Sequence, residues 1–217
     1  MLDEKATTQA LAVMATKFPK VGSSLVADSD FHFLLAVILS AQTTDAAVNR
    51  VTPALFAAYP QPENLMQAQP IEVEKYISTL GLYHNKARYL VACARDLVNN
   101  FASQVPRNHR DLQSLAGVGR KTADVVLAER FHIPALAVDT HVERVSKRLA
   151  MVATDASVLQ TEKVLMTKIP QEEWIHAHHL FITWGRQVCT ARNPACASCP
   201  LLAMCQEGKR RMNEVNV

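Results

Sequence analysis

Four cysteines near the C-terminus form the pattern with the most specific chemistry in this sequence. They have the spacing Cys189-x6-Cys196-x2-Cys199-x5-Cys205. Four thiolates in one short loop predict a closed metal site, because sulfur is a soft ligand that suits iron–sulfur clusters and zinc. Structural zinc commonly uses two close cysteine pairs, whereas this loop has one, so the spacing favours an iron–sulfur cluster. The fifth cysteine, Cys93, lies in an apolar helical pattern and is assigned to packing.

A lysine follows a turn that contains two glycines, Gly117 and Gly119. Two glycines one residue apart indicate a turn that needs positive φ or the close approach of another backbone. Helical patterns on both sides predict a helix-hairpin-helix, whose N–H groups could bind a DNA phosphate. Lys121 lies where the helix dipole disfavours a cation, which points to a nucleophilic amine, and Arg120 adds positive potential beside it. The alternatives are a plain helix connection and a lysine that only contacts a phosphate.

A carboxylate, Asp139, ends an apolar segment just before a predicted helix. Thr140 and Glu143 have the spacing of a capping box, so Thr140 is predicted to cap that helix. Asp139 could simply assist helix initiation. It could instead accept a proton from the lysine amine and stabilise positive charge on a sugar ring as its base departs.

Helical periodicity runs through most of the chain and predicts an all-α fold. Apolar residues recur at spacings of three and four, and no segment shows convincing alternation with period two. Prolines, including Pro53, are expected at helix starts or in connections. The predicted helices are 31–40, 45–59, 72–80, 84–101, 111–116, 121–131, 142–151, 157–168 and 172–188.

Length, charge and apolar content limit the possible classes of protein. A chain of 217 residues suits one compact protein or two packed lobes. The net charge of +3 allows a nucleic-acid partner without requiring one, and the whole basic excess falls in 120–217, which could face phosphates or only solvent. The longest apolar run, 33–39, is too short to cross a bilayer, and no leader is evident. We therefore expect a cytoplasmic protein, nucleoid-associated if bacterial, with no membrane partner and no disulfides.

Segments 115–127 and 138–144 and the cysteine loop together resemble the endonuclease III family, and the resemblance covers essentially the whole chain. It implies two helical lobes. Residues 23–133 would form a six-helix barrel with the helix-hairpin-helix. Residues 1–22 and 134–217 would form a second domain, in which the four cysteines hold a [4Fe-4S] cluster. We expect a monomer.

The resemblance also implies an activity and a partner. Lys121 would be the Schiff-base lysine that displaces a damaged base, expected to be an oxidised pyrimidine, and then nicks the abasic site by β-elimination. Asp139 would assist the first step. The partner would be double-stranded DNA containing damaged bases or abasic sites. The alternative is a non-catalytic helix-hairpin-helix DNA-binding protein with a structural metal site, which would bind phosphates without turnover.

Further DNA contacts follow from the same resemblance. Segment 39–45 is similar to a family segment whose glutamine fills the gap left by an extruded nucleotide, and this glutamine corresponds to Gln42. Segment 81–87 is similar to a family loop whose leucine wedges into the duplex, and this leucine corresponds to Leu82. Without the resemblance, Gln42 would make a loop hydrogen bond and Leu82 would pack in the core. The remaining expected DNA contacts are Gly117, Gly119, Arg120, His141, Arg186 and Arg192.

Two residues depart from the family pattern. Ala116 stands where proline is usual, and we expect it to loosen the hairpin slightly. Asp124 stands where asparagine is often seen, and it adds negative charge close to Lys121.

Overall fold

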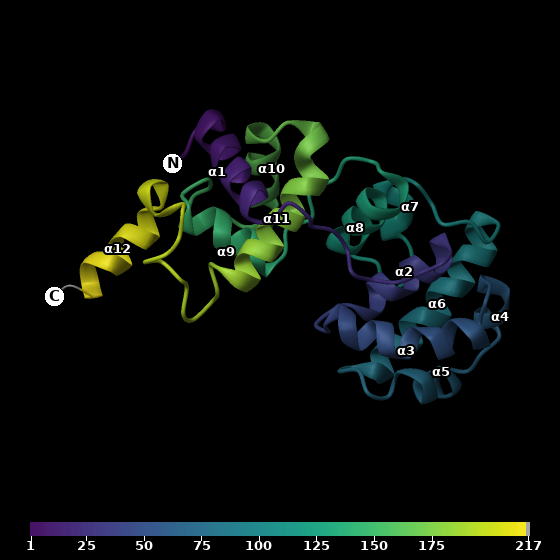
Figure 1. Cartoon of the computed structure of the whole chain (residues 1–217). Coiled ribbons are helices and arrows are strands. Elements are labelled where there is room, and N and C mark those ends of the chain that lie inside the picture. Colours follow the sequence, from purple (N-terminus) through teal and green to yellow (C-terminus); the bar gives the residue numbers. More distant parts are fainter. Residues whose placement is uncertain (216–217) are drawn as a thin grey trace. The chain divides into compact units, whose positions relative to one another are not determined.

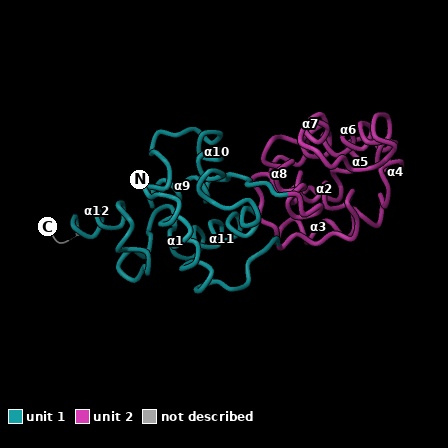
Figure 2. Tube along the Cα trace, turned by 90° about the horizontal axis from the view of Figure 1, so that it is seen from above, with its two compact units in different colours: residues 1–23, 134–217 teal, residues 24–133 magenta. Residues whose placement is uncertain are grey.

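The computed structural model describes residues 1–215, and every regular element in that range is helical (Figure 1). The predicted all-α class is confirmed. The chain divides into two compact units, one made of residues 1–23 and 134–217 and the other of residues 24–133 (Figure 2). Among the described residues, no helix is long and apolar enough to cross a membrane.

The unit of residues 24–133 is built around one buried helix. Every residue from Phe31 to Leu39 in that helix is buried, and all of them except His32 are apolar. The helix packs against three other helices of the unit, as expected when apolar residues cover all sides. Pro62 and Pro70 begin two of the shorter helices, where a missing N–H costs nothing. The helices are α2 (Asp30–Leu39), α3 (Asp45–Ala58), α4 (Pro62–Met66), α5 (Pro70–Ile77), α6 (Tyr83–Phe101), α7 (His109–Gln113) and α8 (Arg120–Phe131).

The other unit joins the two ends of the chain around a second apolar core. Its α-helices are α1 (Glu4–Lys17), α9 (Thr140–Arg148), α10 (Val158–Lys168), α11 (Trp174–Gln187) and α12 (Gln206–Val215). Met14 of α1 and Trp184 and Phe181 of α11 are fully buried in this core. Helix α9 packs closely on α11 at Gly185, where an added Cβ would lie 3.0 Å from the Cβ of His141.

The observed helices differ from the predicted ones in three respects. Helices α1, α4 and α12 were not predicted. The helix expected at 111–116 is α7, which begins at His109 because the Asn108 side chain accepts a hydrogen bond from the backbone of Asp111. The expectation for Pro53 is wrong, since this residue lies inside α3, whose helical structure continues past the missing N–H.

Candidate active site and metal centre

The two glycines of the hairpin have different structural roles. Gly117 has φ +78°, and an added Cβ would lie only 2.9 Å from the Cβ of Tyr89, so this position requires glycine. Gly119 has φ −86° and nothing within 4 Å of an added Cβ. It is the N-cap of α8 and provides no side-chain hydrogen bond to the first turn. The first N–H groups of α8 therefore begin a helix without a side-chain cap.

Lys121 is exposed in the first turn of α8. Gly117, Gly119 and Arg120 are exposed beside it, so the hairpin residues predicted to act together form one accessible surface. The N–H of Ala116 donates to Oδ2 of Asp96 on α6 over 2.9 Å. Proline could not make this bond, so Ala116 tethers the hairpin to α6 and opposes the loosening that we expected.

Asp124 lies one turn beyond Lys121 but is buried. Its Oδ1 lies 3.4 Å from Nε2 of His109 on α7. The carboxylate therefore faces an imidazole on the neighbouring helix. This imidazole is a partner for the negative charge of Asp124 that was expected to act on Lys121.

Asp139 is itself the N-cap of α9. Its Oδ1 accepts hydrogen bonds from the backbone N–H groups of His141 at 2.8 Å and Val142 at 2.9 Å. The predicted capping box is wrong, because Thr140 is the first residue of α9 and Glu143 pairs with Lys147 at 2.6 Å. The aspartate lies one residue earlier, and its charged oxygen reaches the same first-turn donors.

The second oxygen of Asp139 faces a histidine ring. Oδ2 lies 2.9 Å from Nδ1 of His141. Burial by itself raises the pKa of Asp139, but the hydrogen bonds from the His141 ring and the Val142 backbone, with the charges of His141 and His178, outweigh it. The net pKa is lowered, so the group is a carboxylate at neutral pH. No motif pointed to His178, whose Nδ1 lies 2.7 Å from the carbonyl oxygen of Ala137.

Gln42 and Leu82 are exposed at the ends of two neighbouring loops in the unit of residues 24–133. Leu82 is 58% exposed, so the alternative that it packs in the core is wrong. Both residues have left-handed backbone conformations, with φ 53° for Gln42 and 59° for Leu82. Such conformations are uncommon outside glycine and persist only where neighbouring contacts hold them.

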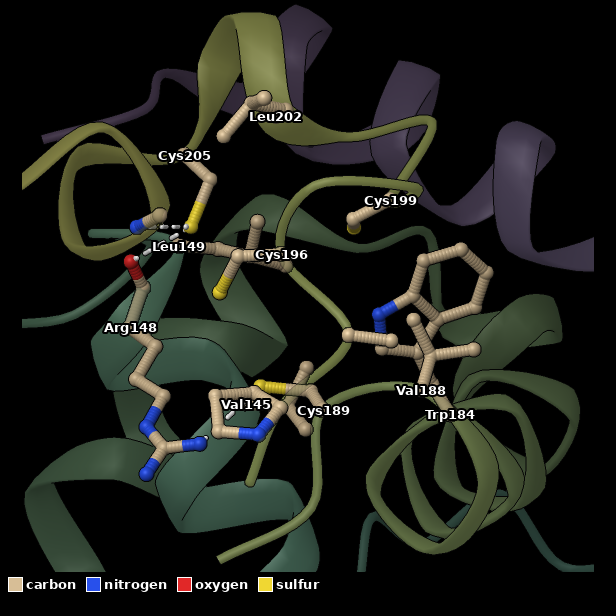
Figure 3. A pocket seen from close by; sticks show the side chains of 13 residues that line it. Val145, Arg148, Leu149, Trp184, Val188, Cys189, Cys196, Cys199, Leu202 and Cys205 are labelled. Carbon is tan, nitrogen blue, oxygen red and sulfur yellow. Dashed lines mark hydrogen bonds between the residues drawn. The ribbon is translucent and has the colours of Figure 1, made fainter. Parts of the chain in front are cut away.

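The four cysteines of the predicted metal site line one pocket in the unit of residues 1–23 and 134–217 (Figure 3). The pocket has a volume of about 360 Å³ that includes space open to solvent. Its walls are mainly apolar and include Trp184, Val188 and Leu149. All four thiols are free.

The surroundings of these sulfur atoms fit an iron–sulfur cluster. The backbone N–H of Gly208 donates to Sγ of Cys205 at 3.2 Å, and Nη1 of Arg148 to Sγ of Cys189 at 3.4 Å. Such hydrogen bonds stabilise cluster ligands. Burial raises the pKa of the Cys199 and Cys205 thiols, so thiolates at these positions need a compensating cation, which iron provides.

Two arginines of α9 hold the start of the cysteine loop, and the sequence patterns did not identify them. Arg148 donates to the carbonyl oxygens of Thr190 at 2.7 Å and Ala191 at 2.8 Å. Arg144 donates to the carbonyl oxygens of Cys189 at 3.1 Å and Gly185 at 2.9 Å. The sequence feature that could have identified them is the spacing of four residues, which puts two basic side chains one helical turn apart on the same face of a helix.

The candidate site residues are divided between the two units. Residues 24–133 contain Lys121, Gln42, Leu82 and the hairpin. The other unit contains Asp139, His141, the four cysteines, and the exposed Arg186 and Arg192.

Two protein families match separate parts of this chain. Residues 35–171 match the HhH-GPD superfamily of base excision DNA repair proteins. Residues 189–205 match the iron-sulfur binding domain of endonuclease III. The fold and the site thus define a helix-hairpin-helix enzyme of base excision DNA repair that has an iron–sulfur binding domain.

Individual relatives specify the family. Endonuclease III of Bacillus subtilis (strain 168) is 45% identical over 97% of this chain and 96% of that protein. Endonuclease III of Escherichia coli (strain K12) is 39% identical over 87% of this chain and 89% of that protein. The chain belongs to the endonuclease III family of DNA glycosylases.

Solved structures agree with this assignment. A non-covalent endonuclease III–DNA complex matches with a TM-score of 0.94 and 48% identity, covering 98% of this chain and 100% of that chain. A thermostable thymine-DNA glycosylase, 22% identical with a TM-score of 0.83, shares the fold over 95% of this chain and 97% of that chain.

Proposed function

We propose that this glycosylase is bifunctional: it removes oxidised pyrimidines from double-stranded DNA and then nicks the abasic site. The observation that carries this proposal is the position of Lys121, an exposed amine directly after a hairpin whose helix begins without a side-chain cap. Uncapped N–H groups at a helix start can hold a phosphate, which would bring the lysine to the DNA backbone. A solved relative that was trapped as a covalent endonuclease III–DNA intermediate supports the same reading.

DNA binding would begin with extrusion of the damaged nucleotide, because its C1′ carbon is inaccessible inside a stacked duplex. Gln42 would fill the gap and Leu82 would wedge between bases. Their exposure and their positions at loop ends suit these roles. Arg120, His141, Arg186 and Arg192 would contact the strand, with the hairpin N–H groups holding one phosphate.

The chemistry would proceed in two stages. The uncharged Lys121 amine forms a bond to C1′ as the bond from C1′ to the base breaks, and the base leaves with the electron pair. Asp139, a carboxylate at neutral pH, accepts the proton released by the amine and stabilises the positive charge on the sugar. The bond from C1′ to O4′ then breaks, O4′ takes up a proton, and the nitrogen lone pair forms the C=N bond of a Schiff base. Loss of a C2′ proton then expels the 3′ phosphate. This sequence requires both residues to reach the same nucleotide.

The active form would be a monomer. Its metal group would be a [4Fe-4S] cluster bound by Cys189, Cys196, Cys199 and Cys205. When bound, the cluster cross-links the loop through iron–sulfur bonds. Its role is structural, because all four protein ligands are thiolates and the walls of the site are apolar. It would thereby fix the loop that carries the exposed Arg192.

Borohydride trapping with abasic-site DNA tests the nucleophile. The native protein should form a covalent adduct, and Lys121→Ala should form none. Lys5→Ala is a matched control, since Lys5 is also an exposed lysine in the first turn of a helix, α1. Trapping by Lys121→Ala at the native level would refute the assignment. Phosphate binding by the native protein without any adduct would identify a non-catalytic DNA-binding protein.

The lesion preference needs a separate experiment. An oxidised pyrimidine, an oxidised purine and a mismatched thymine are placed in one duplex sequence, and single-turnover excision rates are compared. The oxidised pyrimidine should be removed fastest. Faster removal of either other base would reassign the substrate without changing the role of Lys121.

A further inference from the structure

A buried lysine, Lys86, lies in the first turn of α6, close to the loops that present Gln42 and Leu82. Its residue exposure is 4%, and its Nζ donates to Oγ1 of Thr43 over 2.5 Å. Within the part of the chain that the structure describes, no carboxylate pairs with this ammonium group. Burial lowers the pKa of Lys86, and no opposite charge offsets the effect.

The fold does not require a cation at this position. An ammonium group that leaves water for a single hydroxyl partner loses more hydration than one hydrogen bond restores. An unbranched apolar side chain of similar length would fill the same space without that cost. The contacts that Lys86 makes therefore point to a role other than stability.

Lys86 is hydrogen-bonded to both loops. Its ammonium group bonds to Thr43, the residue after Gln42. Its backbone N–H donates to the carbonyl oxygen of Leu82 at 3.0 Å. The Thr43 hydroxyl in turn donates to the carbonyl oxygen of Ala41 at 3.3 Å, so the chain of hydrogen bonds brackets Gln42 on both sides.

This arrangement explains how two non-glycine residues keep left-handed backbones. Gln42 and Leu82 both have positive φ, which costs free energy unless neighbouring contacts hold the backbone. The bond from Lys86 to Thr43 fixes the loop of Gln42 to the helix that begins beside Leu82. Both side chains are thereby presented before DNA arrives, which lowers the ordering cost of binding.

We propose that Lys86 is a positioning residue that holds the Gln42 loop and the Leu82 loop together, so that both side chains enter the duplex as one preformed unit. The inference rests on the proposed function, in which Gln42 and Leu82 enter the DNA. Lys86 touches neither the substrate nor the reacting atoms.

The test compares two substrates that differ in whether a gap must be filled. Lys86→Met keeps the length of the side chain but removes the ammonium group, and Thr43→Val removes the acceptor. Each variant should lower the rate of excision from duplex DNA about tenfold, the loss expected for one hydrogen bond from a charged donor. Strand cleavage at an abasic site in single-stranded DNA should stay within about twofold of native, because no opposite strand has to be separated.

Controls separate positioning from folding. Lys75→Met, at an exposed lysine on α5, should leave both rates unchanged. Lys86→Met should melt no lower than the native protein, since it removes a buried cation. The double variant should lose no more duplex activity than Thr43→Val alone, because that substitution already removes the bond that Lys86→Met breaks.

The outcomes distinguish this inference from the function on which it rests. An unchanged ratio of duplex to single-strand rates in both variants, with an active native enzyme, would overturn the role of Lys86 alone. A native enzyme inactive on both substrates would overturn the proposed function and this inference with it. If Lys86→Met does not fold, Thr43→Val decides the question, because it breaks the same bond at a half-buried position.

Discussion

Asp139 combines two roles that substitution can separate, because it caps α9 and is also the proposed proton acceptor. Asp139→Asn keeps a side-chain oxygen for the N–H groups of His141 and Val142, which the native carboxylate binds at 2.8 and 2.9 Å. Asparagine is about as good an N-cap as aspartate, so we expect a loss of stability below ~0.5 kcal/mol. Asp139→Ala removes the cap and should cost ~1–2 kcal/mol. For a chain of this size, that loss lowers the Tm by about 2–8 °C.

Activity should be lost in both variants, unlike stability, since neither variant retains a carboxylate. Removal of a general base lowers the chemical rate by about 10²- to 10⁴-fold. Single-turnover excision of an oxidised pyrimidine should therefore fall by this factor in both variants, while only Asp139→Ala loses stability. Calorimetry gives the Tm of the same preparations. Near-native excision by Asp139→Asn would refute the proton-acceptor role, and equal destabilisation of the two variants would refute the cap.

The pH dependence of stability gives a second measurement on Asp139. Its pKa in the folded protein is lowered from the ordinary value of 3.8 by the His141 ring, the Val142 N–H and the charge of His178, which together exceed the effect of burial. The ionised form thus stabilises the fold fully above about pH 5, and this contribution is lost as the pH falls through the lowered pKa. The stability difference between native protein and Asp139→Asn, from urea unfolding, should shrink as the pH falls below about 4, because the native carboxylate then becomes protonated. A difference that grows towards acid would contradict this account.

Three further predictions concern the hairpin and the cysteine loop. Gly117→Ala should lower the free energy of unfolding by ~1–3 kcal/mol because of its positive φ and a close side chain. Gly119→Ala should cost less, up to ~1 kcal/mol, because an added Cβ meets nothing within 4 Å and only the poorer N-cap matters, and it should weaken DNA binding in a titration. Cys199→Ser should lose iron in a metal assay while Cys93→Ala retains it, since Cys93 lies away from the pocket. Arg148→Met should release iron to a chelator faster than native protein, because the loop loses the hydrogen bonds that hold its start; an unchanged rate would exclude that role.

Some helices could be predicted from periodicity, and the reasons for the misses are physical. Helix α2 is apolar at every position except Asp30 and His32 and could be identified from that alone. The buried stripe of α1 is Thr7, Ala10, Leu11 and Met14, and its threonine and alanine weaken an apolar pattern although their spacing is helical. Helix α12 carries ion pairs between Glu207 and both Arg210 and Arg211, which an apolar pattern does not register.

The candidate site was predictable where spacing alone carries the chemistry. The four cysteines line one pocket because they fall in one short loop. The choice between Asp139 and Thr140 as the cap was not predictable, since both residue types cap helices and only the local backbone decides. The left-handed backbones of Gln42 and Leu82 could not be predicted either, since the bond between Lys86 and Thr43 beside them joins segments distant in sequence, which no local pattern contains.

The N-terminal helix has a consequence for the order in which a growing chain can acquire its structure. Helix α1 packs against α10 and α11, which the ribosome synthesises more than a hundred residues later. Its apolar residues Ala10, Leu11 and Met14 therefore lack their final neighbours until residues 158–187 have been synthesised. Residues 24–133 are continuous in sequence and form one compact unit, so the contacts within this unit can form as soon as the segment emerges. Synthesis thus favours the middle of the polypeptide as the first part to fold, with the two ends joining last.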